Sequence, residues 1–173
     1  METTQPKTSS IALRYGLIAG LLVIIYALIL QFTDLYMSKT LSYVNYLFVL
    51  GAIIMAYRDF KSQNQGFMTY GQGLGLGTLT AGITGVLSGI FSYIYIKFID
   101  DTMLGKIADM QREELDKNAS MTEEEIEKAI EMSASFTTPE MIMVFSIIGF
   151  VFFGFLMSLV VAAAMRNARP EFE

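Results

Sequence analysis

The sequence has neither cysteine nor histidine among its 173 residues. These absences exclude disulfide bonds, thiol nucleophiles and imidazole bases, and they remove the usual protein ligands of zinc and copper. Charged residues are also missing from the middle of each long apolar run, whereas proton-coupled transporters and intramembrane enzymes normally need at least one there. We therefore expect no cofactor, no metal ion and no enzymatic activity.

Apolar side chains dominate the sequence. Hydrophobic residues make up 53% of the chain and the mean hydropathy is +0.48, both well above a soluble domain, and the length fits one domain. The net charge of −5 is uneven, because Asp100 to Glu140 holds twelve acids and four bases and the rest holds eight bases and five acids. We expect the lipid bilayer as a partner and no nucleic acid.

Four apolar segments predict an all-α membrane protein with four transmembrane helices in a bundle. The expected boundaries are a flexible N-terminus over 1–10, transmembrane helices 1–3 within 11–99, helix 4 over 139–166 and a tail over 167–173. The first run, Tyr15 to Leu30, also resembles a signal peptide, but no small-x-small cleavage site follows Leu30, which favours an uncleaved anchor.

The third apolar segment, 67–99, would form roughly 50 Å of helix against a hydrocarbon core of about 30 Å. It must therefore tilt, bend or project from the membrane. Seven of the 14 glycines lie within its 71–89 stretch, and helical spacing sorts the small residues into two nearly opposite faces. The first face comprises Gly71, Gly75, Thr78, Gly82, Gly85 and Gly89. The second comprises Gly73, Gly77, Thr80, Thr84 and Ser88.

Small residues on both sides predict a central helix clamped between neighbours. Other spans carry ridges of their own: Ala12, Gly16 and Gly20 on the first, and Gly154, Ser158 and Ala162 on the fourth. Both faces could be covered within one chain or between chains, so the sequence leaves both a monomer and an oligomer as alternatives. On this view Gly82→Leu should disrupt packing.

Residues 100–138 predict an acidic hairpin of two soluble helices between the third and fourth spans. Thr122 and Glu125 match a capping box. Asn118-Ala119-Ser120 predicts the break between the two helices, and Thr138 is the expected N-cap of the fourth span. Glu123, Glu127 and Glu131 share a helical face, but such charge runs are usually solvated rather than cation sites.

Basic residues flank the spans unevenly. The two sides of the predicted membrane have equal numbers of basic residues. On one side, however, these residues lie close to the ends of the spans: Lys7, Arg14, Arg58, Lys61, Arg166 and Arg169. The other side has most of its bases in a loop of about forty residues, which the positive-inside rule weights less. The sequence therefore predicts both termini in the cytoplasm and the acidic hairpin on the opposite side of the membrane.

Several motifs resemble one family when taken in order: Phe67-Met68-Thr69-Tyr70-Gly71, the Tyr93-Ile94-Tyr95 to Asp100 element, the Met121-Thr122-Glu123-Glu124 helix start, and the ending Gly154 to Ala163. The chain resembles small membrane proteins of the Bacteroidota described as domain of unknown function 4199. In the family a proline often follows the aspartate, where this chain has Asp101. The resemblance implies a protein of the bacterial inner membrane with four spans, a periplasmic helical insert and no assigned activity. Because members are often encoded near membrane glycosyltransferases, it also implies such an enzyme as partner.

The function expected from these features is a non-enzymatic inner-membrane scaffold or accessory subunit, linked through the resemblance to envelope lipid or glycan synthesis. The alternative is a lipid- or small-solute-binding or transport protein that uses a groove beside the glycine-rich third helix, lined by Thr80, Thr84 and Ser88. Intramembrane catalysis has the least support, since it would rely on Asp100 and Asp101 at the interface.

Overall fold

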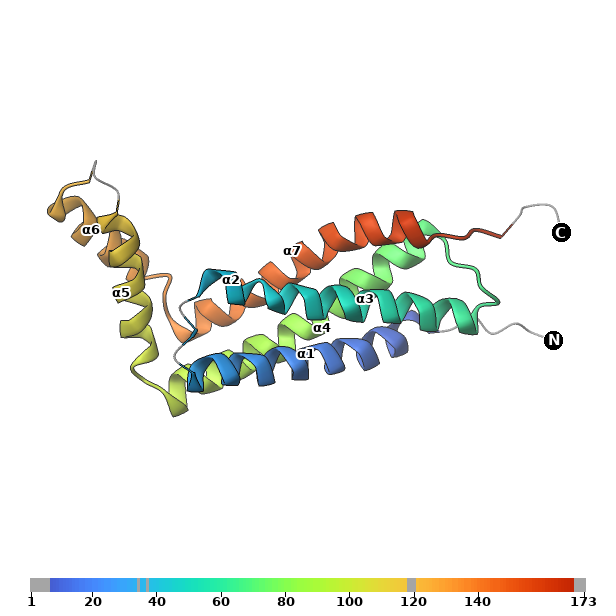
Figure 1. Ribbon diagram of the computed structural model, residues 1–173, viewed down its shortest axis with the longest axis horizontal. Helices are drawn as coiled ribbons and strands as arrows, with labels where there is room; N and C mark the ends of the chain where they lie inside the picture. The colour runs from blue at the N-terminus through green and yellow to red at the C-terminus, as the bar shows by residue number, and fades with distance from the viewer. Residues whose placement is uncertain (1–6, 34, 37, 118–120, 170–173) are drawn as a thin grey trace. The chain divides into compact units, whose positions relative to one another are not determined.

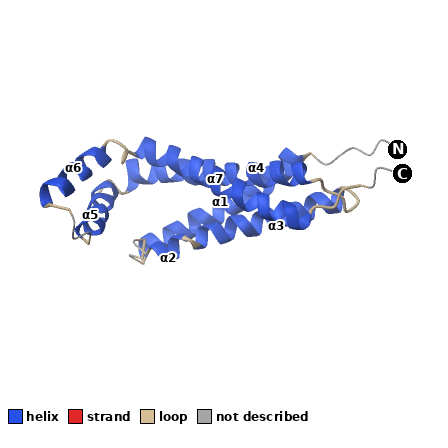
Figure 2. Cartoon of the chain, turned by 90° about the horizontal axis from the view of Figure 1, so that it is seen from above, coloured by secondary structure: helices blue, strands red, loops and turns tan. Residues whose placement is uncertain are grey.

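The computed structural model describes residues 7–33, 35–36, 38–117 and 121–169. Helices form every regular element of this part of the chain, which confirms the all-α class (Figures 1 and 2). Met68 and Asn167 add an isolated β-bridge. The elements in order are α1 (Thr8–Phe32), α2 (Lys39–Ser42), α3 (Val44–Gln63), α4 (Tyr70–Ile94), the π-helical turn η1 (Tyr95–Ile99), α5 (Met103–Asp116), α6 (Glu123–Ala134) and α7 (Pro139–Met165).

Four of these helical segments are long and apolar enough to cross a membrane. They are Thr8–Phe32, Thr40–Gln63, Tyr70–Ile99 and Pro139–Met165. This confirms the expected number of helices that are able to cross a membrane. By contact, the chain divides into two compact units, Met1–Ser88 with Ile147–Glu173 (unit 1) and Gly89–Ser146 (unit 2), which we describe separately.

The ends of the helices differ from the sequence expectations in several places. The first helix starts at Thr8 rather than Ile11, while residues 1–6 of the expected flexible segment lie outside the described part. Helix α3 continues past Tyr57 to Gln63, because Arg58 and Lys61 are good helix formers. Gln65 and Gly66, with φ of 55° and 86°, then turn the chain into α4.

The long third span ends in a wider turn. Residues Tyr95–Ile99 form a π-helix, and the Asp100 amide donates to the Tyr95 carbonyl at 2.9 Å. Such turns are rare and usually occur as single insertions within α-helices. The change in winding falls where the apolar run gives way to the acidic segment.

Unit 1 has one buried cluster to which all four long helices contribute. Its members from α3 include Ile53, Ala56, Tyr57 and Phe60, which are almost completely buried. The other members are Ile11 and Ala12 of α1, Val49 of α3, Met68, Leu76 and Ala81 in and before α4, and Ala162 of α7. Small residues at the helix contacts let the backbones approach closely.

Helices α1 and α4 meet through the predicted glycine ridge of α1. A Cβ built on Gly16 would lie 2.7 Å from the Ile83 Cβ and 2.8 Å from the Thr80 carbonyl oxygen. One on Gly20 would lie 2.7 Å from a Leu87 methyl carbon. The Thr84 hydroxyl donates to the Gly16 carbonyl at 3.1 Å, which adds a hydrogen bond between the helices. The approach is therefore too close for any larger residue at Gly16.

Unit 2 contains the predicted acidic helix pair. The Ser133 hydroxyl of α6 donates to Gln111 of α5 at 2.7 Å, and Arg112 lies 3.4 Å from Glu123. Thr122 and Glu125 form the capping box, which confirms this part of the sequence analysis. Because the Thr122 amide and hydroxyl donate to the Glu125 carboxylate, they lower the pKa of Glu125. The predicted break at 118–120 lies outside the described residues.

Unit 2 also contains the ends of two spans. The Thr138 hydroxyl accepts from the Met141 amide at 3.2 Å, as expected for the N-cap of α7. The Lys97 ammonium donates to Glu140 at 3.0 Å and to the Tyr93 hydroxyl at 2.6 Å. Hydrogen bonds from the Thr102 hydroxyl and then from Lys106 lower the pKa of Asp100.

Candidate functional site

The second small-residue face of α4 lies inside unit 1. Gly73 faces Ala162 of α7, where an added Cβ would be 3.0 Å from the Ala162 Cβ. Thr80 and Thr84 are fully buried and Ser88 is 5% exposed. Both threonine hydroxyls also donate to carbonyls one turn earlier on α4. This face therefore packs against neighbouring helices and does not line an open groove.

Three helices meet at Gly77 on the covered face. The Tyr57 hydroxyl of α3 and the Ser158 hydroxyl of α7 both point at Gly77, and an added Cβ would lie 2.6 Å from the Tyr57 oxygen. Both hydroxyls are fully buried, and neither makes a hydrogen bond of acceptable geometry with the described residues. Gly77 thus provides the space for two polar side chains.

The first small-residue face behaves differently along its length. Gly71 and Gly75 have nothing within 4 Å of an added Cβ, and Gly82 would meet only a Val151 methyl group at 3.5 Å. Further along, Gly85 is covered, because its Cβ would lie 2.8 Å from the Phe150 Cβ. Gly89 is also buried. One stretch of this face, from Gly71 to Gly82, is therefore open within the described chain.

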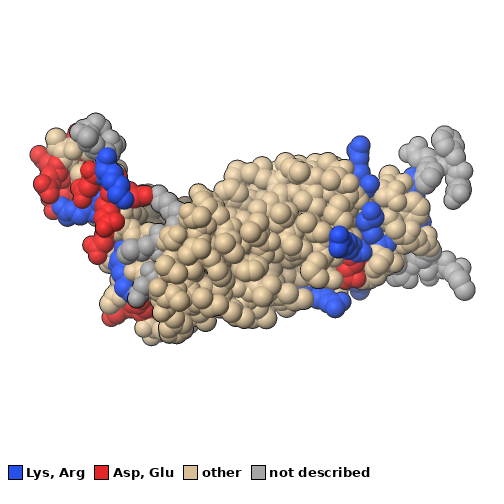
Figure 3. Space-filling view, viewed as in Figure 1, with Lys and Arg blue, Asp and Glu red and all other residues tan. Residues whose placement is uncertain are grey.

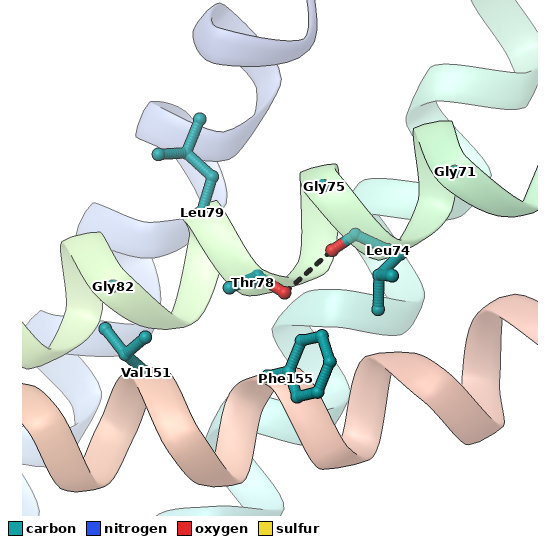
Figure 4. Close-up of a pocket in the computed structure, with 8 residues that line it drawn as sticks. All are labelled: Gly71, Leu74, Gly75, Thr78, Leu79, Gly82, Val151 and Phe155. Carbon is teal, nitrogen blue, oxygen red and sulfur yellow. Dashed lines mark hydrogen bonds between the residues drawn. The ribbon is translucent and has the colours of Figure 1, made fainter.

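A groove of about 690 Å³ runs along this open stretch, between α4 and α7 (Figure 4). Its lining consists of Gly71, Leu74, Gly75, Thr78, Leu79, Gly82, Val151 and Phe155. Thr78 supplies the one hydroxyl, which donates to the Leu74 carbonyl at 2.8 Å. A groove without charge and with its hydroxyl already paired suits an apolar occupant.

The sequence pattern predicts the glycines of this face but not the other walls of the groove. Leu74 and Leu79 flank the glycines on α4, and Val151 and Phe155 come from α7. Nothing in the local sequence marks the two α7 residues, because they belong to an unbroken apolar run. The groove also lies across the helix from Thr80, Thr84 and Ser88, where the sequence analysis expected it.

The ridge of α7 packs against the covered side of α4. Gly154, Ser158 and Ala162 are all buried, and a Cβ on Gly154 would overlap the Ala81 Cβ. By contrast, Gly82 has room for a methyl group. A larger residue should therefore disrupt packing more at Gly154 or Gly77 than at Gly82, because these two positions have no room for an added side chain.

The groove and its surroundings lack the groups that polar chemistry needs. Within the ranges that the structure describes, no three Asp or Glu residues come together as a metal site. Thr78 is the one polar side chain in the groove. The geometry can therefore hold an apolar helix or acyl chain.

These features define a class of protein: an α-helical chain with four helices able to cross a membrane, in which one small-residue face of the third is only partly covered. Residues 14–167 match the family described as Protein of unknown function (DUF4199), and the chain belongs to that family. This confirms the family that the sequence motifs indicated. Neither the curated proteins nor the solved structures include a match.

Proposed function

We propose that this protein is a non-enzymatic scaffold or accessory subunit whose open α4 face binds a transmembrane helix of a partner protein. The observation that carries the proposal is the free space at Gly71 and Gly75 beside fully packed glycines on the same helix. In a bilayer, small residues favour helix association because they permit close van der Waals contact.

The covered face of α4 indicates which occupant the open face would accept. On the covered side, Gly73 and Gly77 are four residues apart and contact α7 at Ala162 and Ser158. On the open side, Gly71 and Gly75 repeat this spacing, followed by Thr78 and Gly82. Since the same spacing already receives a helix within unit 1, a helix is the occupant that best fits the open side.

We expect Gly71→Leu/Gly75→Leu to abolish partner binding while leaving folding intact, because both positions have free space within the chain. A photo-crosslinking amino acid at Leu79, a groove residue that is 43% exposed, would capture the occupant in native membranes. Crosslinks mapped by mass spectrometry to a transmembrane helix of another protein, lost at least tenfold in the double variant, support the proposal.

Gly51→Leu is the matched control, because Gly51 also has nothing within 4 Å but lies on α3. It should leave the crosslinks unchanged. Crosslinks only to lipid or only to a second copy of this chain would contradict the proposed partner helix. A membrane glycosyltransferase is the partner class implied by the family resemblance, and the mapped peptides would identify or exclude it.

The second candidate function is lipid binding in the same groove. It is favoured by the apolar lining and by the length of the groove. Gly71 and Gly82 are eleven residues apart, so the groove extends about 16 Å along α4, close to half of a hydrocarbon core of about 30 Å. One acyl chain from one leaflet would fit that length. Crosslinks from Leu79 to lipid alone would favour this candidate. A small polar solute is not favoured as the occupant, because the groove lining has no free polar group that would bind it.

We also propose that the four spans form a transmembrane bundle in a bacterial inner membrane, with cytoplasmic termini and a periplasmic helix pair. The positive-inside rule supports this orientation. Since the chain has no cysteine, single-cysteine variants give a clean test. A membrane-impermeant maleimide should label Met132→Cys in spheroplasts and Ser62→Cys only after lysis. The reverse pattern would invert the topology.

A further inference from the structure

Basic side chains gather at one end of unit 1, where α3 and α7 end (Figure 3). Lys61 lies in the last turn of α3, and Arg166 directly follows α7. Arg169 comes three residues later. Among the described residues of unit 1, Asp59 is the one acid, and it is already bonded by Gln63 at 3.0 Å and paired with Arg14 at 3.8 Å. The local charge is therefore strongly positive.

The segment after α7 is held in place by the turn between α3 and α4. Asn167 and Met68 exchange two backbone hydrogen bonds of 2.8 Å, and the Asn167 side chain donates to the Gly66 carbonyl at 3.1 Å. Arg169 donates to Gln65 at 3.1 Å, and its guanidinium lies 5.3 Å from the Phe67 ring centre. These contacts fix the backbone on both sides of Arg166.

Lys61 of α3 lies beside the end of α7. Its ammonium donates to the Met165 carbonyl at 3.1 Å, so its charge lies beside the residue that precedes Arg166. Arg166 is exposed and has no ion-pair or side-chain hydrogen-bond partner within the described ranges. The held backbone thus presents a guanidinium that has no partner among the described residues, one residue after the carbonyl that Lys61 bonds and three residues before Arg169.

We propose that Lys61, Arg166 and Arg169 form a binding site for the phosphate of an anionic phospholipid. Two segments that are able to cross a membrane end at Gln63 and Met165, close to these residues in the chain, and lipid headgroups surround a spanning helix at its ends. A guanidinium recognises phosphate through paired hydrogen bonds, and basic pockets between spans are typical headgroup sites. The site is independent of the open α4 face, so either proposal can fail alone.

The test is a titration of the purified full-length protein with phosphatidylglycerol in neutral detergent, followed by native mass spectrometry. Arg166→Gln should weaken binding about fivefold, as expected for about 1 kcal/mol per basic group at a membrane surface. Arg166→Gln/Arg169→Gln should weaken it further. Phosphatidylcholine, whose choline offsets the charge of its phosphate, should bind more weakly than phosphatidylglycerol and should respond less to either variant.

Lys128→Gln is the matched control, because it removes one positive charge from α6, where Lys128 pairs with Glu124 at 2.8 Å. It should bind phosphatidylglycerol as the parent protein does. An unchanged melting temperature of Arg166→Gln would show that the loss concerns the lipid and not the fold. Equal binding by Arg166→Gln and the parent, or an equal loss in Lys128→Gln, would overturn the site.

Discussion

Replacing Gly154 by alanine should destabilise the protein by about 1–3 kcal/mol, the usual cost of overpacking a well-packed interior. The added Cβ would overlap the Ala81 Cβ of α4. Neither Cβ can rotate out of the way, because each is fixed to its helix backbone. Helices α4 and α7 must therefore separate, which also loosens the neighbouring contact of Ser158 with Gly77. Thermal unfolding in mild detergent should show a clearly lowered midpoint.

The same substitution at Gly149 is the control for this prediction. Gly149 lies on α7, five residues before Gly154, and nothing approaches within 4 Å of an added Cβ. Alanine is also the better helix former, by about 1 kcal/mol in water. Gly149→Ala should therefore unfold at the same temperature as the parent or slightly above it. Equal midpoints for the Gly154→Ala and Gly149→Ala variants would mean that α4 and α7 do not pack as described.

The sequence was sufficient to predict the number of spans and the local starts of helices. Long uncharged runs have few alternatives, and the cap at Thr122 depends on residues only three positions apart. The positions at which helices end were harder to predict. Arg58 and Lys61 looked like a stop after the second span, yet their long side chains let α3 continue to Gln63.

The sequence was not sufficient to predict which face of α4 is covered. Gly71 and Gly73 belong to equivalent small-residue patterns, and a helical wheel treats them alike. The difference comes from non-local packing, since the α7 ridge contacts the Gly73 side while Val151 and Phe155 reach only the edge of the other. Such pairings depend on the rotation of each helix, which a run such as Val151-Phe152-Phe153 leaves undetermined.

The partly open face and the buried hydroxyls suggest different uses of glycine on one helix. At Gly71 and Gly75 the missing side chain leaves a surface free for another molecule. At Gly77 it makes room for Tyr57 and Ser158 within the chain. Stability and binding should therefore be separable along α4: variants of the first pair should affect association, whereas variants at Gly77 should affect folding.

Replacing Tyr57 by alanine should cost about 3–5 kcal/mol of stability, as for other large aromatic side chains removed from a packed interior. Tyr57 is fully buried and is a member of the central cluster of unit 1. Tyr57→Phe keeps the ring and removes only the hydroxyl, which lacks a hydrogen-bond partner among the described residues. Since burying an unpaired hydroxyl is unfavourable, Tyr57→Phe should be as stable as the parent or more stable.

Thermal unfolding of the two variants, with Ser158→Ala beside them, separates a packing role from a chemical one. If Tyr57 serves only to fill space at Gly77, the alanine variant alone should unfold early. A loss in Tyr57→Phe of more than about 1 kcal/mol would instead show that the hydroxyl has a bonding partner, since a net hydrogen bond contributes about that much. The Ser158 hydroxyl, which faces the same Gly77, is the nearest candidate for that partner, and an equal loss in Ser158→Ala would identify it.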